Sequence, residues 1–202
     1  MTPLFYDEHL LIVEKPAGLL SVPGRLAEHK DCLITRLQLS YPEALIVHRL
    51  DMATSGLMVM ARSPDAHRRL SKAFAERQVD KAYEALVSGV MAMDEGQVAE
   101  PLITDWPNRP RQMIDYEKGK PSLTLYRVMH RLKDATRVEL KPVTGRSHQL
   151  RVHMLSLGHA IIGDSLYVPE DPSPRLMLHA KFLSFPHPFG DEVMRFDSPV
   201  PF

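Results

Sequence analysis

Residues 46–60 read IVHRLDMATSGLMVM. An apolar segment leads into HRLD (48–51), polar and glycine residues at 54–56 indicate a turn, and a second apolar segment follows. The pattern predicts two buried strands joined by a loop that exposes Asp51, and scaffolds commonly present catalytic groups on such loops. On these residues alone, Asp51 can equally serve to organise the turn by accepting hydrogen bonds from backbone N–H groups.

Hydrophobic periodicity and turn residues predict the other elements. We expect helices over 31–40, 64–77 and 147–157, the first capped by Asp31, the second by Ser63 and the third ended by Gly158. We expect further strands over 9–14, 57–61, 82–90, 122–129, 136–141 and 176–183. Many strands interrupted by few helices predict an α+β fold with a mixed, largely antiparallel sheet.

The composition is that of an ordinary globular chain: of 202 residues, 44% are hydrophobic and 25% are charged. The formal net charge is zero, from 25 basic and 25 acidic residues, which by itself argues weakly against a nucleic-acid-binding class. Basic residues nevertheless gather in 61–81, 105–120 and 141–151, so the sequence allows a basic face. No apolar run approaches the roughly 20 residues that cross a bilayer. A single cysteine, Cys32, excludes an internal disulfide and fits a reducing cytosol.

The segment HRLDMATSG (48–56) resembles the active-site motif of the RluA-type pseudouridine synthases. Other segments are similar to that family in order and spacing, namely EKPAGLLSVPG, VPGRLAEHKD, KAYEALVSG, DWPNRPRQ, KPVTGRSHQLRVHM and LGHAIIGD. The resemblance implies the family's fold, in which two lobes of a mixed, mostly antiparallel sheet surround a central catalytic cleft. It also implies that residues 1–202 are one catalytic domain without a separate N-terminal RNA-binding module.

The same resemblance implies roles for individual residues. Asp51 matches the catalytic carboxylate, Arg151 the arginine that pairs with it, and Tyr83 the tyrosine that stacks on the target uracil. Arg49 matches an arginine that fills the space left by the nucleotide flipped out of the RNA. The other residues expected to bind RNA are Arg109, Arg111, Arg146 and His148.

The chemistry explains why a carboxylate is needed. Pseudouridine forms when uracil leaves the ribose at N1 and reattaches through C5. The carboxylate of Asp51 can attack the anomeric carbon, abstract a sugar proton or stabilise the positive charge that develops on the sugar, and the sequence leaves these three routes open. Because burial disfavours the charged form of a carboxylate, we expect a cation beside Asp51.

The expected substrate is RNA. By resemblance, the target is a uridine in a hairpin loop of 23S ribosomal RNA and in the anticodon stem-loop of certain tRNAs. No cofactor or metal is expected, because the isomerisation is redox-neutral. We further expect a cytoplasmic monomer without a membrane partner.

Three other functions compete with this interpretation. A metalloenzyme would use the histidines that follow residue 147, but His148 and His153 are five residues apart and diverge on a helix. A glycoside or nucleoside hydrolase generally pairs its catalytic carboxylate with a second acid, which the sequence near Asp51 lacks. A catalytically inactive RNA-binding module would not need Asp51, Tyr83 and Arg151 together.

Overall fold

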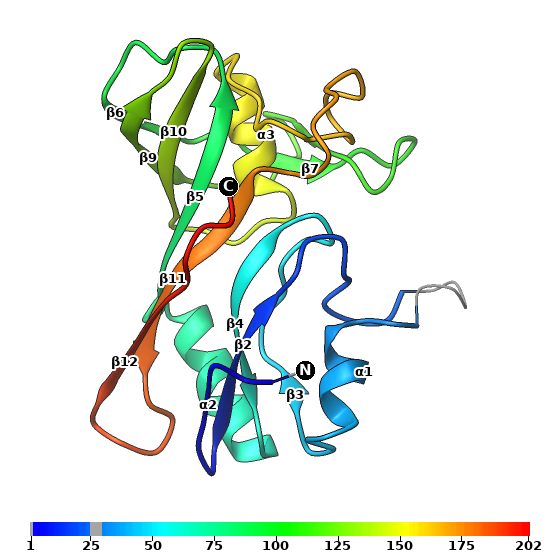
Figure 1. The fold of residues 1–202 in the computed structure, drawn as a ribbon, viewed down its shortest axis with the longest axis vertical. Helices are drawn as coiled ribbons and strands as arrows, with labels where there is room; N and C mark the ends of the chain where they lie inside the picture. Colours follow the sequence, from blue (N-terminus) through cyan, green and yellow to red (C-terminus); the bar gives the residue numbers. More distant parts are fainter. Residues whose placement is uncertain (1, 25–29) are drawn as a thin grey trace. The chain divides into compact units, whose positions relative to one another are not determined.

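The computed structural model describes residues 2–24 and 30–202, and residues 25–29, within the segment VPGRLAEHKD, lie outside it. The chain forms two compact units, whose strands and helices are drawn in Figure 1. The first unit contains Met1–Lys81 and Ala180–Pro201, and the second contains Ala82–His179 and Phe202. No helix in the described part of the chain is long and apolar enough to span a membrane.

The first unit is built on neighbouring strands in the order β1 (Phe5–Tyr6), β2 (Leu10–Lys15), β4 (Ser55–Ala61) and β11 (Leu178–Pro186). β3 (Leu45–Ile46) also pairs with β4, and β12 (Val193–Asp197) pairs with β11. The pairs β1–β2, β2–β4, β3–β4 and β11–β12 are antiparallel. Every residue of β4 is buried, so both faces of this strand are covered.

Helix α2 (Pro64–Ala75) packs on one face of these strands. The Ser63 hydroxyl oxygen accepts a hydrogen bond from the Ala66 N–H at 3.1 Å, and Pro64 occupies the first turn. The predicted helix start is therefore confirmed. The apolar residues that α2 shares with the sheet form the core of the unit: Leu10, Ile12, Leu57, Val59, Ala61, Ala66, Leu70, Ala73, Val79, Leu183 and Phe185.

Helix α1 (Leu33–Gln38) is shorter than predicted, and the prediction that Asp31 caps it is wrong. The N-cap residue is Cys32, whose N–H donates to the Thr35 hydroxyl oxygen at 3.1 Å. The Asp31 carboxylate instead forms an ion pair with the Arg36 guanidinium at 2.6 Å. The Asp31 carboxylate, which precedes the helix, is bound by an arginine five residues further along the chain, so the N-cap position falls to the next residue, Cys32.

Gly56 allows β11 to lie directly against the start of β4. Its φ is +121°, and a Cβ at this position would lie 2.4 Å from the Ala180 carbonyl oxygen. Only glycine combines that backbone conformation with so close an approach. Gly56 pairs with Lys15 of β2 on its other side, so the start of β4 is fixed between two strands.

The second unit contains an antiparallel sheet in the order β5 (Asp80–Ser88), β10 (Ala135–Pro142), β9 (Thr124–Arg131) and β6 (Glu95–Val98). β7 (Leu102–Thr104) and β8 (Gln112–Ile114) form a separate two-stranded sheet, and α3 (Gln149–Ser156) contacts β8, β9 and β10. The antiparallel pairings and the few helices confirm the predicted α+β class.

We expect Ser63→Ala to lower the free energy of unfolding by about 1 kcal/mol, because it removes the N-cap of α2. Urea denaturation followed by circular dichroism measures the change. The control is Ser71→Ala in the interior of the same helix, where alanine is a better helix former than serine and no loss is expected. Equal stabilities of the two variants would contradict the capping role.

Candidate active site

Asp51 lies in the loop between β3 and β4, in the first unit. Its side chain is partly exposed, and its carbonyl oxygen accepts a hydrogen bond from the Thr54 N–H at 3.1 Å, which closes the turn. The predicted loop is therefore present, but it follows a short, half-buried strand, and the predicted turn residues Ser55 and Gly56 lie in β4 instead.

The residue before Asp51 is fixed by the Ser21 side chain. The Ser21 hydroxyl donates to the Leu50 carbonyl oxygen at 2.7 Å, and the Leu50 N–H approaches the same hydroxyl oxygen at 3.2 Å. Both groups are buried, so water does not compete for these bonds. One serine thus satisfies both backbone polar groups of Leu50.

The residue after Asp51 is fixed by Lys15 and Gly18. The Lys15 ammonium donates to the Met52 carbonyl oxygen at 3.0 Å, and the Gly18 N–H donates to the same oxygen at 2.8 Å. The ammonium also donates to the carbonyl oxygens of Pro16 (2.9 Å) and Leu19 (2.7 Å). The segment 15–21 therefore holds the backbone on both sides of the candidate catalytic carboxylate.

Lys15 is a buried cation in the neighbourhood of Asp51. Its side chain is 0% exposed, and its three N–H donors match three carbonyl acceptors. Burial lowers the pKa of Lys15 to about 8, and the negative charge of Asp51 opposes this shift. The sequence predicts a cation beside Asp51, and Lys15 is one that our reading of the sequence missed.

A signal for Lys15 is nevertheless present in the sequence. Successive side chains of a strand point to opposite faces, so Lys15 lies on the same face of β2 as Leu11 and Val13. Both of these residues are fully buried. A lysine in register with core residues has to find acceptors inside the protein, because an unpaired buried charge is costly.

His48, three residues before Asp51, has a structural role. Its Nε2 accepts a hydrogen bond from the Val59 N–H at 3.1 Å, and its ring stacks on Phe74 at a centroid distance of 4.6 Å. Burial, together with the positive charge of Lys81, lowers the pKa of His48 to about 3, so the ring is neutral. The next residue, Arg49, is exposed.

In the second unit, Arg151 on α3 is only 6% exposed. It forms a bidentate ion pair with Asp164, with Nη2–Oδ1 and Nε–Oδ2 distances of 2.6 and 2.8 Å. Its guanidinium also lies over the Tyr167 ring, 5.1 Å from the centroid. This geometry fixes the direction of the guanidinium. Arg151 is therefore not a solvated surface arginine.

Tyr167 connects several of the predicted residues of the second unit. Its hydroxyl group shares a hydrogen bond of 2.8 Å with His148 Nδ1 and accepts one of 2.8 Å from the Gln112 N–H. The Arg111 guanidinium lies 5.3 Å from its ring centroid. The structure thus brings Arg111, His148 and Arg151 together around a tyrosine that the sequence analysis did not identify.

The other predicted residues of the second unit have different neighbours. Tyr83 is a half-buried residue of β5 that pairs with Leu140 of β10. Arg109 lies over the Trp106 ring at 4.3 Å, and Arg146 is exposed. The side chain of His153, which a metal site would need, hydrogen-bonds with Ser122 and Thr124, and no group of three or more potential metal ligands occurs among residues 2–24 and 30–202.

Comparisons with known proteins give consistent results. A family model described as RNA pseudouridylate synthase matches residues 9–156. The chain is similar to the dual-specificity RNA pseudouridine synthase RluA of Escherichia coli K12, with 53% identity over 98% of this chain and 93% of the relative. It is also similar to the protein of that name from Yersinia pestis, with 52% identity over 97% of each chain.

Two solved human structures have a similar fold. The first is RNA Pseudouridylate Synthase Domain Containing 1, with a TM-score of 0.84 and 31% identity over 100% of this chain and 84% of that chain. The second is RNA Pseudouridylate Synthase Domain Containing 4, with a TM-score of 0.81 and 26% identity over 98% of this chain and 88% of that chain.

We expect Lys15→Met to lower the free energy of unfolding by about 3 kcal/mol, because it leaves the buried Leu19 carbonyl oxygen without its donor and removes one donor each from the carbonyl oxygens of Pro16 and Met52. Chemical denaturation measures this change. The matched control is Lys133→Met, which removes an exposed lysine in the turn between β9 and β10 and should leave stability within about 0.5 kcal/mol of the parent. Equal stabilities of the two variants would show that the Lys15 bonds contribute nothing.

The lowered pKa of Lys15 also predicts a pH dependence of stability. Between its folded pKa of about 8 and its ordinary value of 10.5, the unfolded chain keeps the proton and the folded chain releases it. The Lys15 contribution to the free energy of unfolding should therefore rise with pH through this window and stay constant below it. Denaturation from pH 7 to 10 should show this rise in the wild type relative to Lys15→Met, and parallel profiles would contradict it.

Proposed function

Because the chain belongs to the RNA pseudouridylate synthase family, we propose that it isomerises uridine to pseudouridine in stem-loop RNA with Asp51 as the catalytic carboxylate. The chain is an RNA pseudouridine synthase, and therefore an isomerase. The observation that supports the role of Asp51 most strongly is the fixed backbone on both sides of it, at Leu50 and Met52. Catalytic groups gain from such preorganisation because no free energy is spent on ordering them during the reaction.

The proposed reaction is balanced without a cofactor. The N1–C1′ bond of uridine breaks, the uracil turns over, a C5–C1′ bond forms, and the proton leaves C5 while N1 gains one. Asp51 acts at the sugar by attack on C1′, by removal of a sugar proton, or by stabilising the developing positive charge. Each route requires an ionised carboxylate, and Lys15 supplies positive charge on the same unit.

Arg151 and Tyr83 complete the proposed catalytic set. We assign to Arg151 the role of the cation that pairs with the catalytic carboxylate, as in the family. The bidentate bond to Asp164 supports this role because it gives the guanidinium one orientation. Tyr83, half-buried on β5, would stack its ring on the flipped uracil.

The proposed substrates are a hairpin loop of 23S ribosomal RNA and the anticodon stem-loop of certain tRNAs. The dual specificity in the names of the relatives supports a choice of two RNAs. We assign RNA binding to Arg49, which would fill the space left by the flipped nucleotide, and to a further set of residues: Arg109, Arg111, Arg146 and His148. Exposed arginines suit contact with phosphates, and Arg49, Arg109 and Arg146 are exposed.

We also propose that residues 1–202 form a single catalytic domain with a central cleft. We further propose that the protein is a monomer and lies in the cytoplasm, where both kinds of RNA are found. None of them is needed for the assignment of Asp51.

We expect Asp51→Asn to reduce pseudouridine formation by at least about 10³-fold, because the amide can neither attack the sugar nor accept its proton. Tritium release from C5-labelled uridine in the two stem-loop RNAs measures the reaction. The matched control, Asp134→Asn, changes an exposed acid in the turn between β9 and β10 and should retain activity.

Chromatography of the digested RNA distinguishes isomerisation of uridine from hydrolysis of its glycosidic bond. Retained base with loss of the C5 hydrogen supports isomerisation, whereas free uracil in solution would contradict it. Full activity of Asp51→Asn would remove Asp51 from the mechanism.

A further inference from the structure

The loop between β7 and β8 carries the only tryptophan of the chain, Trp106, and exposes it. The indole side chain is 65% exposed, although tryptophan is among the side chains that gain most from burial. It occupies a loop of the second unit that the catalytic assignment does not explain. An exposed aromatic ring on an ordered loop offers a face on which a second flat ring can stack.

The loop is ordered by its own hydrogen bonds. The Asp105 N–H donates to the Arg111 carbonyl oxygen at 3.0 Å, and the Arg111 N–H donates to the Asn108 carbonyl oxygen at 3.0 Å. The Asn108 side-chain amide donates to both oxygens of the Asp105 carboxylate, at 2.9 and 3.1 Å. These bonds hold Trp106 in place before any ligand binds, which lowers the entropic cost of binding.

Arg109 gives the same loop a positive charge next to the indole. Its guanidinium carbon lies 4.3 Å from the Trp106 ring centroid, so it covers one face of the ring. The large exposed fraction of Trp106 leaves the other face open. Within the described residues, no carboxylate forms an ion pair with Arg109.

Two acids close to this loop in the sequence, Asp105 and Asp115, already accept hydrogen bonds. The Asp105 carboxylate binds the Asn108 amide, and the Asp115 carboxylate accepts hydrogen bonds from the N–H groups of Glu117 and Lys118 at 2.9 and 2.8 Å. An open aromatic face beside an unpaired guanidinium suits a group that is flat and apolar on one part and anionic on another. A nucleotide has that chemistry.

We propose that Trp106 and Arg109 form a binding site for an unpaired nucleotide of the RNA substrate, in which the base stacks on the open indole face and the phosphate binds the guanidinium. This nucleotide is an addition to the target uridine, and the proposal rests on the RNA substrate proposed above. In a duplex, both faces of a base are covered by its neighbours, so the site selects single-stranded loops over paired helices.

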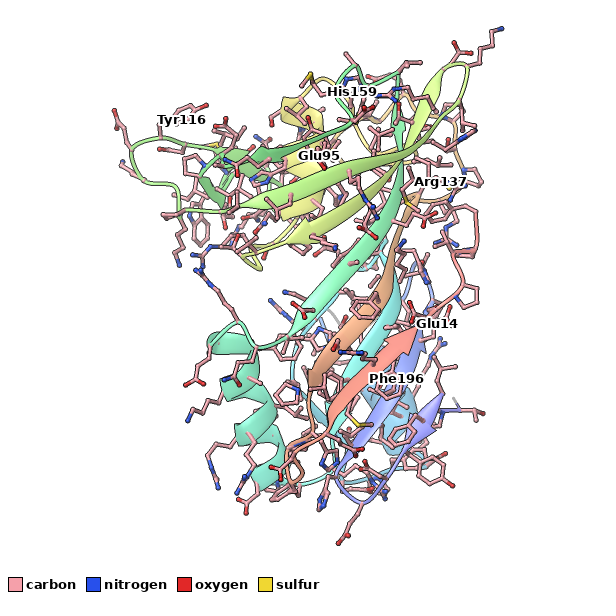
Figure 2. All side chains as sticks on the ribbon, turned by 90° about the vertical axis from the view of Figure 1, so that its left-hand side faces the viewer. Glu14, Glu95, Tyr116, Arg137, His159 and Phe196 are labelled. Carbon is pink, nitrogen blue, oxygen red and sulfur yellow. The ribbon has the colours of Figure 1, made fainter. Side chains whose placement is uncertain are left out.

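Tyr116, in the loop that follows β8, is the other strongly exposed ring of this part of the chain, and Figure 2 labels it on that loop. Its hydroxyl group hydrogen-bonds with Glu100, which raises the pKa of Tyr116. The Tyr116 hydroxyl group is bound to a carboxylate, whereas the Trp106 ring has the Arg109 guanidinium over it. Trp106 therefore offers an anionic nucleotide the better stacking surface.

The single tryptophan makes the test direct, because all indole fluorescence comes from Trp106. The full chain is titrated with a stem-loop RNA that has an unpaired uridine and with a fully paired duplex of equal length. Binding is followed in parallel by the anisotropy of a labelled RNA. We expect the stem-loop to quench the tryptophan emission as it binds, and the duplex to leave the emission unchanged at equal occupancy.

Two variants test the energetic contribution. We expect Trp106→Ala to raise the Kd for the stem-loop by about 10-fold and to leave the Kd for the duplex unchanged, with Trp106→Phe in between. Tyr6→Ala, which removes a ring that is 61% exposed in the first unit, is the control and should bind like the wild type. Because Trp106 is exposed, Trp106→Ala should have the same melting temperature as the wild type.

Each result decides the matter. Stem-loop binding without any change in tryptophan emission, or with an unchanged Kd for Trp106→Ala, would overturn the nucleotide site while leaving the proposed function intact. If Trp106→Ala changes the molecular mass of the protein assembly in solution and leaves the Kd for the stem-loop unchanged, the ring would instead contact a second copy of the chain. Failure of the wild type to bind either RNA would overturn the site and the proposed function together.

Discussion

The ammonium group of Lys15 is the constraint on which the architecture of the first unit depends. It is fully buried, and its three donors are used by the carbonyl oxygens of Pro16, Leu19 and Met52. A buried charge is tolerated only where all its hydrogen bonds are made, so the segment after β2 and the loop before β4 have to keep their positions together. Asp51 lies in that loop, and its backbone has little freedom as a result.

The second unit also contains a buried cation with fixed hydrogen-bond partners. Arg151 is buried, and Asp164 pairs with it through both carboxylate oxygens. Tyr167 lies beside the guanidinium and hydrogen-bonds with His148. In the first unit the buried cation holds the backbone next to Asp51, and in the second unit the buried cation, Arg151, is itself a residue that the family resemblance assigns to the reaction. The cost of burying each charge is offset by the hydrogen bonds that Lys15 makes and by the ion pair between Arg151 and Asp164.

The sequence predicted those structural features that depend on a local pattern of residues. Ser63 followed by proline marks the start of α2 correctly, because capping uses only neighbouring residues. Asp31 is not the cap, and its carboxylate pairs instead with Arg36, five residues further along the chain. The partner of Arg151 is 13 residues away, and the pairing exists only once α3 and the following loop are folded. The short strands β7 and β8 have too few residues to show an alternating pattern, so the loop that exposes Trp106 was not predicted as a hairpin.

Carbon-13 NMR titration of lysine side chains, with Lys15 assigned by the Lys15→Met variant, would show whether a buried ammonium group is coupled to the catalytic loop. We expect a pKa of about 8 for Lys15 in the folded wild type. Because the negative charge of Asp51 raises this pKa, Asp51→Asn should lower it further. A Lys15 pKa near 10.5 that is the same in both proteins would contradict a buried ammonium coupled to the catalytic loop.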